Sequence, residues 1–284
     1  MISNGGKPAV LVIVLTLNEE ANLPGCLDSL AGLDCEITIV DSGSNDGTLE
    51  IARERDVRVV QHPFENYSAQ RNWAQKSLPT RANWVLHLDA DERLTPELVK
   101  EINTLLQGPP TNVDGYLLRK RTIFMGRWMR HGGHYPSFHL RLFRPEKGCC
   151  EDRLYDQHFV VTGRIQALRN DYLDIVASDI TTWSARHLRW ARLEAEEALR
   201  PETSASHVKS DLFGSPIERK RWLRNDLYGR APLLVRPFLY WTYRYMLRLG
   251  FLDGVEGMIF HFLQACWFRF VTDCLILERR LKNS

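Results

Sequence analysis

The stretch WVLHLDADER, residues 84–93, decides the fold. It begins with an apolar run short enough to be a buried strand, and the run ends in two carboxylates one residue apart, Asp89 and Asp91. A strand does not bury such charges without partners. At the carboxyl end of a parallel strand, an Asp-x-Asp pair can hold a hard divalent cation that also binds phosphate oxygens. The pattern favours a nucleotide diphosphate site, and the alternative is an ordinary turn after a strand.

Strands and helices alternate on both sides of this stretch. The expected strands are 10–17, 36–41 and 57–61, and the expected helices are 21–33, 48–55, 67–77 and 96–106. Thr95 is the expected N-cap of the last helix because Pro96 follows it at the first helical position. The alternation predicts an α/β fold with a mostly parallel sheet whose ligands gather at the carboxyl edge.

Carboxylates and amides, rather than glycines, follow the expected strands. Asn18 and Glu19 follow the first strand, and Asp41 ends the second. The sequence has no G-x-G-x-x-G after the first strand and no G-x-x-x-x-G-K-[ST], which disfavours a dinucleotide-binding Rossmann domain and a P-loop. Side chains that accept hydrogen bonds at strand ends suit a site that recognises a nucleobase and a ribose and holds the diphosphate through a cation.

The net charge of +2 conceals an uneven distribution of charge. Acids exceed bases up to residue 107, whereas residues 115–147 carry a run of arginines and lysines against the single acid Glu146. This arrangement predicts an anionic substrate rather than a nucleic acid, and the alternative is a solvated basic surface. The six cysteines form no C-x-x-C pair or zinc spacing, and no signal peptide is evident, so we expect a reducing compartment.

The last third of the chain is rich in apolar and aromatic residues with interspersed arginines. Residues 227–284 predict amphipathic helices that lie in a membrane interface, because charges such as Arg269 and Asp273 disfavour insertion across a bilayer. The alternatives are helices that pack on the catalytic domain or form an oligomer interface. Residues 201–214 are polar with little periodicity, and we expect a mobile loop there.

Four separated motifs carry a resemblance to a known family. They are LVIVLTLNEEANL (11–23), VDSGSNDGT (40–48), AQRNWA (69–74) and HLDADE (87–92). Together they resemble the nucleotide-binding half of the family 2 glycosyltransferases, which have the Rossmann-like GT-A fold. Residues 132–159 are similar to the branch that contains lipopolysaccharide-core glycosyltransferases. The resemblance implies a UDP-sugar or a related nucleotide-sugar donor, Mg²⁺ or Mn²⁺, and inversion at the sugar carbon.

The resemblance also implies roles for residues on the donor side. Asp41 would accept the N3 proton of uracil, Asp89 would face the ribose and the water shell of the metal, and Asp91 would bind the metal directly. The remaining donor-binding candidates are Leu17, Asn18 and Glu19, which would line the base, and Arg71, which would approach the nucleotide.

The acidic pair Glu151 and Asp152 falls where the family has its catalytic acids. Transfer needs one carboxylate to take the proton of the acceptor hydroxyl, and we assign Asp152 as this general base, with Glu151 as the second candidate. The alternative for the pair is an ion pair with Arg153 or Arg144. The chain has Asp156-Gln157 where many relatives have His-Glu, which weakens any role carried over to those two positions.

The acceptor side has three further candidates. His134 follows two glycines that let the backbone approach a ligand, and Arg141 and Arg144 belong to the basic run. A solvated or core position is the alternative for each of them.

These observations predict a GT-A glycosyltransferase domain at 1–190, divided into a nucleotide-sugar part (1–110) and an acceptor side (111–190). A helix and loop (191–226) and a membrane-associating helical tail (227–284) would follow. The expected function is metal-dependent, inverting hexosyl transfer to a lipid-linked or cell-envelope glycan at the cytoplasmic face of the plasma membrane, with a homo-oligomer possible. The alternatives are a polyprenyl-phosphate sugar synthase, a nucleotidyltransferase, which would be expected to have a glycine- and lysine-rich loop, and a non-catalytic membrane-bound scaffold.

Overall fold

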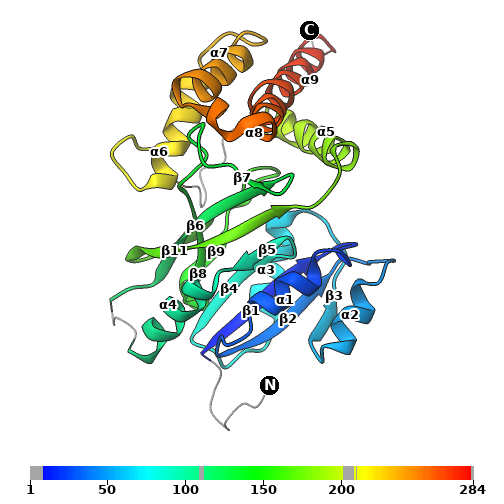
Figure 1. Ribbon diagram of the computed structural model, residues 1–284, viewed down its shortest axis with the longest axis vertical. Coiled ribbons are helices and arrows are strands. Elements are labelled where there is room, and N and C mark those ends of the chain that lie inside the picture. The colour runs from blue at the N-terminus through cyan, green and yellow to red at the C-terminus, as the bar shows by residue number, and fades with distance from the viewer. Residues whose placement is uncertain (1–8, 109–111, 201–207, 209, 283–284) are drawn as a thin grey trace. The chain divides into compact units, whose positions relative to one another are not determined.

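The apolar run of the WVLHLDADER stretch is the buried strand β4 (Trp84–Asp89), which pairs in parallel with β1 (Val10–Thr16) (Figure 1). Strands β2 (Cys35–Asp41) and β3 (Arg58–Gln61) continue the parallel part of the sheet beyond β1. Nearly every side chain of β1 and β4 is buried, as a parallel sheet covered by helices requires. The carboxyl ends of β1, β2 and β4 therefore meet at one edge.

The computed structural model describes residues 9–108, 112–200, 208 and 210–282. They fall into two compact units. The first unit comprises 1–120, 138–150 and 158–175, and the second comprises 121–137, 151–157 and 176–284. The domain boundaries predicted near 110, 190 and 226 stay predictions. Residues 201–207 and 209 of the predicted mobile loop lie outside the described residues.

The sheet is mixed, because antiparallel strands follow its parallel half. Its order in space is β3-β2-β1-β4-β8-β6-β11-β5. The added strands are β5 (Glu92–Leu94), β6 (Gly115–Phe124), β8 (Ser137–Phe143) and β11 (Ile165–Val176). β8 runs antiparallel to β4, and β5 antiparallel to β11. A short 3-10 turn (Pro145–Lys147) leads into the separate pair β9 (Gly148–Cys150) and β10 (Phe159–Val161).

Three helices of the first unit begin at the predicted residue, and the first begins at Leu23 rather than at residue 21. The helices are α1 (Leu23–Ser29), α2 (Thr48–Glu54), α3 (Tyr67–Ser77) and α4 (Pro96–Gln107). The side chain of Thr95 accepts a hydrogen bond from the Leu98 amide at 3.3 Å and caps α4, and Asn66 caps α3 in the same way. The predicted α/β fold, with a mostly parallel sheet and flanking helices, is confirmed.

The second unit is mainly helical, which confirms the predicted C-terminal helical region (Figure 1). Its α-helices are α5 (Ile180–Glu197), α6 (Pro216–Trp222), α7 (Arg236–Thr242), α8 (Gly254–His261) and α9 (Phe268–Lys282). Between them lie the π-helical segments η2 (Leu223–Tyr228), η3 (Tyr243–Leu247) and η5 (Phe262–Trp267), and the 3-10 turn η4 (Gly250–Asp253). The short strand β7 (Arg127–Trp128) pairs with the end of β6.

Two contacts inside the second unit tie its helices together. α9 packs along α5, and the fully buried Asp273 of α9 forms an ion pair with Arg236 of α7 at 2.5 Å. Within the described residues, one continuous helical stretch, Gly250–Lys282, has the length and apolar composition of a membrane-crossing helix, judged by these two properties alone.

Candidate functional site

Asp89 ends β4 in the first unit and is held by two arginines. Arg71 of α3 donates through Nη2 to both carboxylate oxygens, at 2.9 and 3.1 Å, and Arg141 of β8 donates to Oδ2 at 3.2 Å. Burial opposes ionisation of this carboxyl, but the two guanidinium groups outweigh it and hold the pKa of Asp89 below its usual range. Asp89 is therefore a fixed negative charge at the sheet edge.

Asp91, two residues further on, is in the opposite situation. Burial raises the pKa of this half-buried carboxyl well above its usual range, and nearby Asp174, Asp89, Glu92 and Glu19 raise it further. In the part of the chain that the structure describes, its side chain has no hydrogen bond or ion pair. Asp91 is thus a carboxylate that lacks a compensating positive charge.

A divalent cation fits this environment. No group of three or more His, Cys, Asp or Glu side chains among the described residues is arranged as a complete protein cage for a metal. Mg²⁺ and Mn²⁺ sites that bind nucleotides do not need such a cage, because one or two carboxylates suffice when phosphate and water supply the other ligands. Asp91 could ligate the ion, and the remaining negative charge around it would favour a cation there.

Glu92, Lys120 and Asp174 are parts of this site that the sequence analysis missed. Glu92 is buried, accepts from Arg141 at 2.5 Å, and accepts from the Asp89 amide at 2.9 Å. Lys120 of β6 pairs with Asp174 of β11 at 2.9 Å. Glu92 could have been suspected from its place directly after Asp91. The other two could not, because only the pairing of distant strands brings them to the site.

Asp41, the expected uracil acceptor, is fully buried at the end of β2, and its oxygens are occupied. Oδ1 accepts from the hydroxyls of Thr16, at 2.9 Å, and Ser44, whereas Oδ2 accepts from the amides of Gly43 and Ser44 at 2.9 Å each. Asp41 thus shapes the loop after β2, with Gly43 at φ +96°. A contact with a base needs one donor to leave, and the Ser44 hydroxyl can rotate away more easily than a backbone amide.

The loop after β1 is fastened to the loop after β2. The Asn18 amide donates to the Ser44 hydroxyl at 2.9 Å, and the Asn18 side chain accepts from the Asn45 amide at 2.9 Å. The Glu19 amide donates to the Thr48 hydroxyl at 2.8 Å. We call these two connected loops the double loop, and Leu17, within the first of them, is half exposed. The structure therefore gathers the predicted donor-side residues Leu17, Asn18, Glu19 and Asp41. Asp89 and Asp91 lie at the same carboxyl edge, at the end of β4, and Arg71 reaches Asp89 there from α3.

The three acceptor-side candidates all contact other protein groups. Arg141 belongs to the donor-side cluster, because it bonds Asp89 and Glu92 instead of presenting its guanidinium group to an acceptor. Arg144 lies over the ring of Trp84, with its guanidinium carbon 4.7 Å from the ring centre. His134, in the second unit, contacts the Thr122 hydroxyl at 2.9 Å and Arg244 Nη2 at 3.1 Å.

Glu151 and Asp152 lie in the second unit and differ sharply in exposure. Glu151 is fully buried, pairs with Arg221 Nη2 at 2.9 Å, and accepts from the Val208 amide at 2.7 Å. An ion pair was the expected alternative for this residue, but its partner is Arg221 rather than Arg153 or Arg144. Asp152 is exposed and remains the better candidate for a base that must reach an acceptor.

Asp156 and Gln157, which depart from the pattern of many relatives, are used inside the same loop. Asp156 forms an ion pair with Arg224, and Gln157 Nε2 donates to the Arg153 carbonyl at 2.8 Å. These contacts account for both side chains without a metal or an acceptor.

The α/β fold, with carboxylates gathered at the carboxyl edge of its sheet, is of the glycosyltransferase type. The family model described as glycosyl transferase family 2 matches residues 11–175, and the chain belongs to this family. An uncharacterized glycosyltransferase of Rickettsia conorii is 30% identical over 283 residues, covering 97% of this chain and 92% of that protein. The lipopolysaccharide core biosynthesis glycosyltransferase LpsC of Rhizobium meliloti is 27% identical and covers 91% of each chain.

Other matches are partial or concern the fold alone. The relative from Rickettsia prowazekii is 30% identical over 150 residues, and the match spans only 47% of its length. Among solved structures, the mannosyltransferase PcManGT from Pyrobaculum calidifontis, in complex with GDP-Man and Mn²⁺, superposes with a TM-score of 0.51 at 17% identity, covering 98% of this chain and 88% of that one. This likeness confirms the GT-A type of fold.

Proposed function

We propose that the protein is a metal-dependent, inverting hexosyltransferase that moves a sugar from a UDP-sugar to a lipid-linked or cell-envelope glycan. The observation that carries the proposal is the uncompensated carboxylate of Asp91 at the carboxyl edge of a family 2 sheet. The name of the LpsC relative supports a cell-envelope acceptor.

The donor side supplies fixed groups around the diphosphate. Asp91 would hold Mg²⁺ or Mn²⁺, which when bound stabilises the charge of the leaving diphosphate as a Lewis acid. Asp89, fixed by Arg71 and Arg141, keeps its charge and its orientation beside that position. The double loop that contains Asn18 and Asp41 would receive the base.

The acceptor side needs a proton acceptor on the opposite face of the sugar. The exposed carboxylate of Asp152 takes the proton of the acceptor hydroxyl while that oxygen attacks the anomeric carbon. Attack from the face opposite the diphosphate inverts the configuration at this carbon. Glu151, buried against Arg221, has no access to the acceptor in this arrangement.

The direct test is transfer of radiolabel from UDP-hexoses to cell-envelope lipid extract by the purified full chain, with and without Mn²⁺. We expect metal-dependent transfer with inverted configuration, abolished in Asp152→Asn while UDP still binds. Transfer to added polyprenyl monophosphate instead of the extract would indicate a polyprenyl-phosphate sugar synthase. Nucleotide binding without transfer to either acceptor would contradict the proposal and favour a scaffold.

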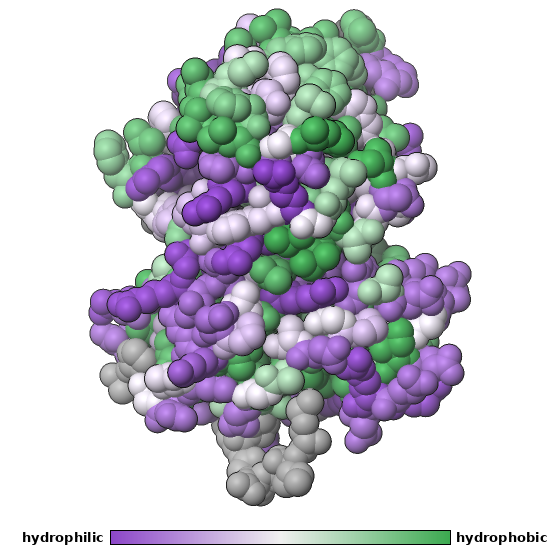
Figure 2. Space-filling view, viewed as in Figure 1, coloured by the Kyte–Doolittle hydropathy of each residue, from purple (hydrophilic) through white to green (hydrophobic). Residues whose placement is uncertain are grey.

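We also propose that the protein attaches to the cytoplasmic face of the plasma membrane through its second unit. Between residues 235 and 262, the exposed side chains are almost all apolar or aromatic (Figure 2). We call this set the apolar face: Val235, Phe238, Leu239, Tyr243, Met246, Leu247, Leu249, Phe251, Leu252, Val255, Met258 and Phe262. Three charged residues of the same stretch turn inward, since Arg244 and Asp253 are buried and Arg236 pairs with Asp273.

The exposed charged residues in and just before this stretch of the chain complement an anionic bilayer. From residue 215 to residue 262 the exposed charged residues are Arg219, Lys220, Arg230 and Arg248, all of them basic. An apolar face accompanied by these exposed basic residues, which we call the cationic rim, matches lipid headgroups and the upper acyl region better than water. A second copy of this chain would carry the same basic residues, and the two sets of positive charges would repel each other. Attachment at the membrane would also bring the enzyme to a lipid-linked acceptor.

A further inference from the structure

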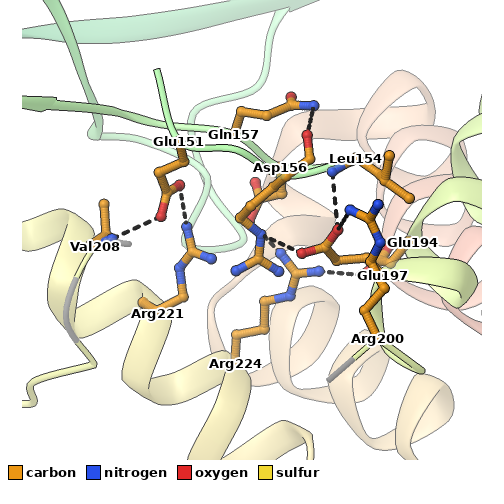
Figure 3. Close-up of polar contacts among 11 residues, drawn as sticks. Glu151, Leu154, Asp156, Gln157, Glu194, Glu197, Arg200, Val208, Arg221 and Arg224 are labelled. Atoms are coloured by element: carbon orange, nitrogen blue, oxygen red, sulfur yellow. Dashed lines mark hydrogen bonds and ion pairs between the residues drawn. The ribbon is translucent and has the colours of Figure 1, made fainter. Parts of the chain in front are cut away.

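The segment Glu151–Gln157, which carries Asp152, has no regular secondary structure and joins β9 to β10. Within the second unit it is held by charged side chains of the helices (Figure 3). We call it the base loop. Because no sheet ladder fixes this loop, its conformation depends on those helices.

The first attachment is a buried ion pair at the start of the base loop. Glu151 Oε2 meets Arg221 Nη2 of α6 at 2.9 Å, and both side chains are almost completely buried. The Val208 amide donates to the other carboxylate oxygen at 2.7 Å. A buried charge that loses its partner is strongly destabilising, so this pair favours one position of Glu151.

The second attachment joins the middle of the base loop to α5. Glu197 accepts from the Leu154 amide at 3.0 Å and pairs with Arg153 at 3.3 Å. Further along, Arg224 of η2 links Asp156 to Glu194, which also pairs with Arg269 of α9 at 2.5 Å. The base loop is thus connected to α5, α6, η2 and, through Glu194, α9.

Between these attachments lies Asp152, exposed and next to the buried Glu151. Holding Glu151 inward fixes the backbone from which Asp152 projects outward. We propose that Arg221 is a positioning residue, which sets the geometry of the general base through Glu151. This inference rests on the proposed function, since it assumes that Asp152 is the base. The helical unit would then have a direct part in turnover in addition to any attachment to a membrane.

The test compares Arg221→Ala with Arg236→Ala as a matched control. Arg236 also forms a buried ion pair with an acid of the helical unit, Asp273, but none of its contacts involves the base loop. Two readouts are measured for each variant: amide hydrogen exchange of residues 151–157, and release of UDP from UDP-glucose and UDP-N-acetylglucosamine in the presence of Mn²⁺.

We expect Arg221→Ala to increase exchange in the base loop and to lower kcat at least about tenfold, with the donor KM changed less than about twofold, because a positioned base contributes 10²–10⁴ in rate. Arg236→Ala should change neither readout. Arg221→Lys, which keeps the charge but loses the planar guanidinium group, should give an intermediate kcat. If Arg221→Ala does not fold, the comparison of Arg221→Lys with Arg236→Lys decides.

Equal kcat values for the Arg221 variants and the wild type would overturn the positioning role, as would an equal loss of kcat in the Arg236 control. Unchanged exchange in the base loop of Arg221→Ala would overturn the structural part of the inference alone. An Asp152→Asn variant with wild-type turnover would instead overturn the base assignment on which the inference rests.

Discussion

Asp89 and Asp91 lie two residues apart but have opposite electrostatic environments, and from this difference we infer different roles for them. Asp89 is neutralised by Arg71 and Arg141, whereas Asp91 faces other carboxylates without a cation of its own. The first is therefore a fixed structural charge, and the second is the group whose electrostatic energy improves most when a cation binds. The same carboxylate, Asp91, therefore lowers the stability of the metal-free protein and would hold the metal.

The variant Asp91→Asn should stabilise the metal-free protein and lose its response to metal. Removing an uncompensated charge relieves repulsion in the folded state, so we expect Tm without divalent ions to rise. Mn²⁺ with UDP should raise the Tm of the wild type by mass action but leave that of Asp91→Asn unchanged. Thermal melting with and without both ligands measures this. Asp152→Asn, which also removes one carboxylate, is the control and should keep the response; an equal response in Asp91→Asn would contradict the metal assignment.

The position of the site could be predicted from the sequence, but the partners of its residues could not. Asp89 and Asp91 follow a local apolar run, so their place at a strand end is visible in the sequence. Arg141 reaches Asp89 only because β8 pairs antiparallel with β4, and that register is a tertiary property. For the same reason the sequence placed Arg141 on the acceptor side, and it did not identify Arg221 as the partner of Glu151.

At the scale of elements, α5 contains a histidine that can be protonated only with difficulty. His187 is buried; its Nδ1 donates to the Trp183 carbonyl at 2.8 Å, and its Nε2 accepts from Gln264 at 3.2 Å. Burial lowers the pKa of His187 to about 4. Protonation of His187 would add an N–H at Nε2 that faces the amide donor of Gln264. This unfavourable contact agrees with the lowered pKa.

The helical unit should therefore lose stability in acid through His187. The unfolded chain takes up the proton near pH 6.5 and the folded one only near 4, so the stabilising contribution is present above 6.5 and is lost as the pH falls through 4. Its full size is roughly 3 kcal/mol. In His187→Phe, which can keep the stacking on Trp183, denaturant unfolding between pH 7 and 4 should show a shallower loss of stability. An unchanged slope would contradict the role of His187.

The elements of the first 107 residues follow closely from local signals, and the later ones do not. Thr95 caps α4 as the sequence predicts, and β1 and most of β4 are apolar runs. The antiparallel strands β6, β8 and β11 contain polar and charged residues whose partners lie far along the chain, so periodicity alone does not define them. The helical tail was visible from its composition, but the inward orientation of its charges required the structure.

At the scale of the whole molecule, the apolar face should determine membrane binding. In the variant Leu247→Gln/Leu252→Gln, two side chains that are 73% and 49% exposed lose their apolar character without disturbing a core. We expect binding to vesicles with phosphatidylserine to fall at least about tenfold, since each leucine contributes up to about 1.5–3 kcal/mol on burial. Cosedimentation measures this.

The matched control is Ile165→Gln, which changes a 38% exposed side chain in the first unit and should leave vesicle binding unchanged. Pure phosphatidylcholine vesicles should bind the wild type more weakly, because the cationic rim then has no anionic partner. Unchanged binding of the double variant would contradict the proposal. A wild-type dimer that the double variant converts to a monomer would assign the apolar face to a second copy instead.

We expect this family 2 chain to bind uridine diphosphate through a cation on Asp91. Calorimetric titration measures this binding. UDP, GDP, ADP and CDP are titrated into the wild type and Asp91→Asn, each with and without Mn²⁺. We expect the wild type to bind UDP in preference to the other three and only with Mn²⁺, and we expect Asp91→Asn to lose this binding. Binding of UDP that is equally tight without Mn²⁺, or equally tight in Asp91→Asn, would contradict this expectation.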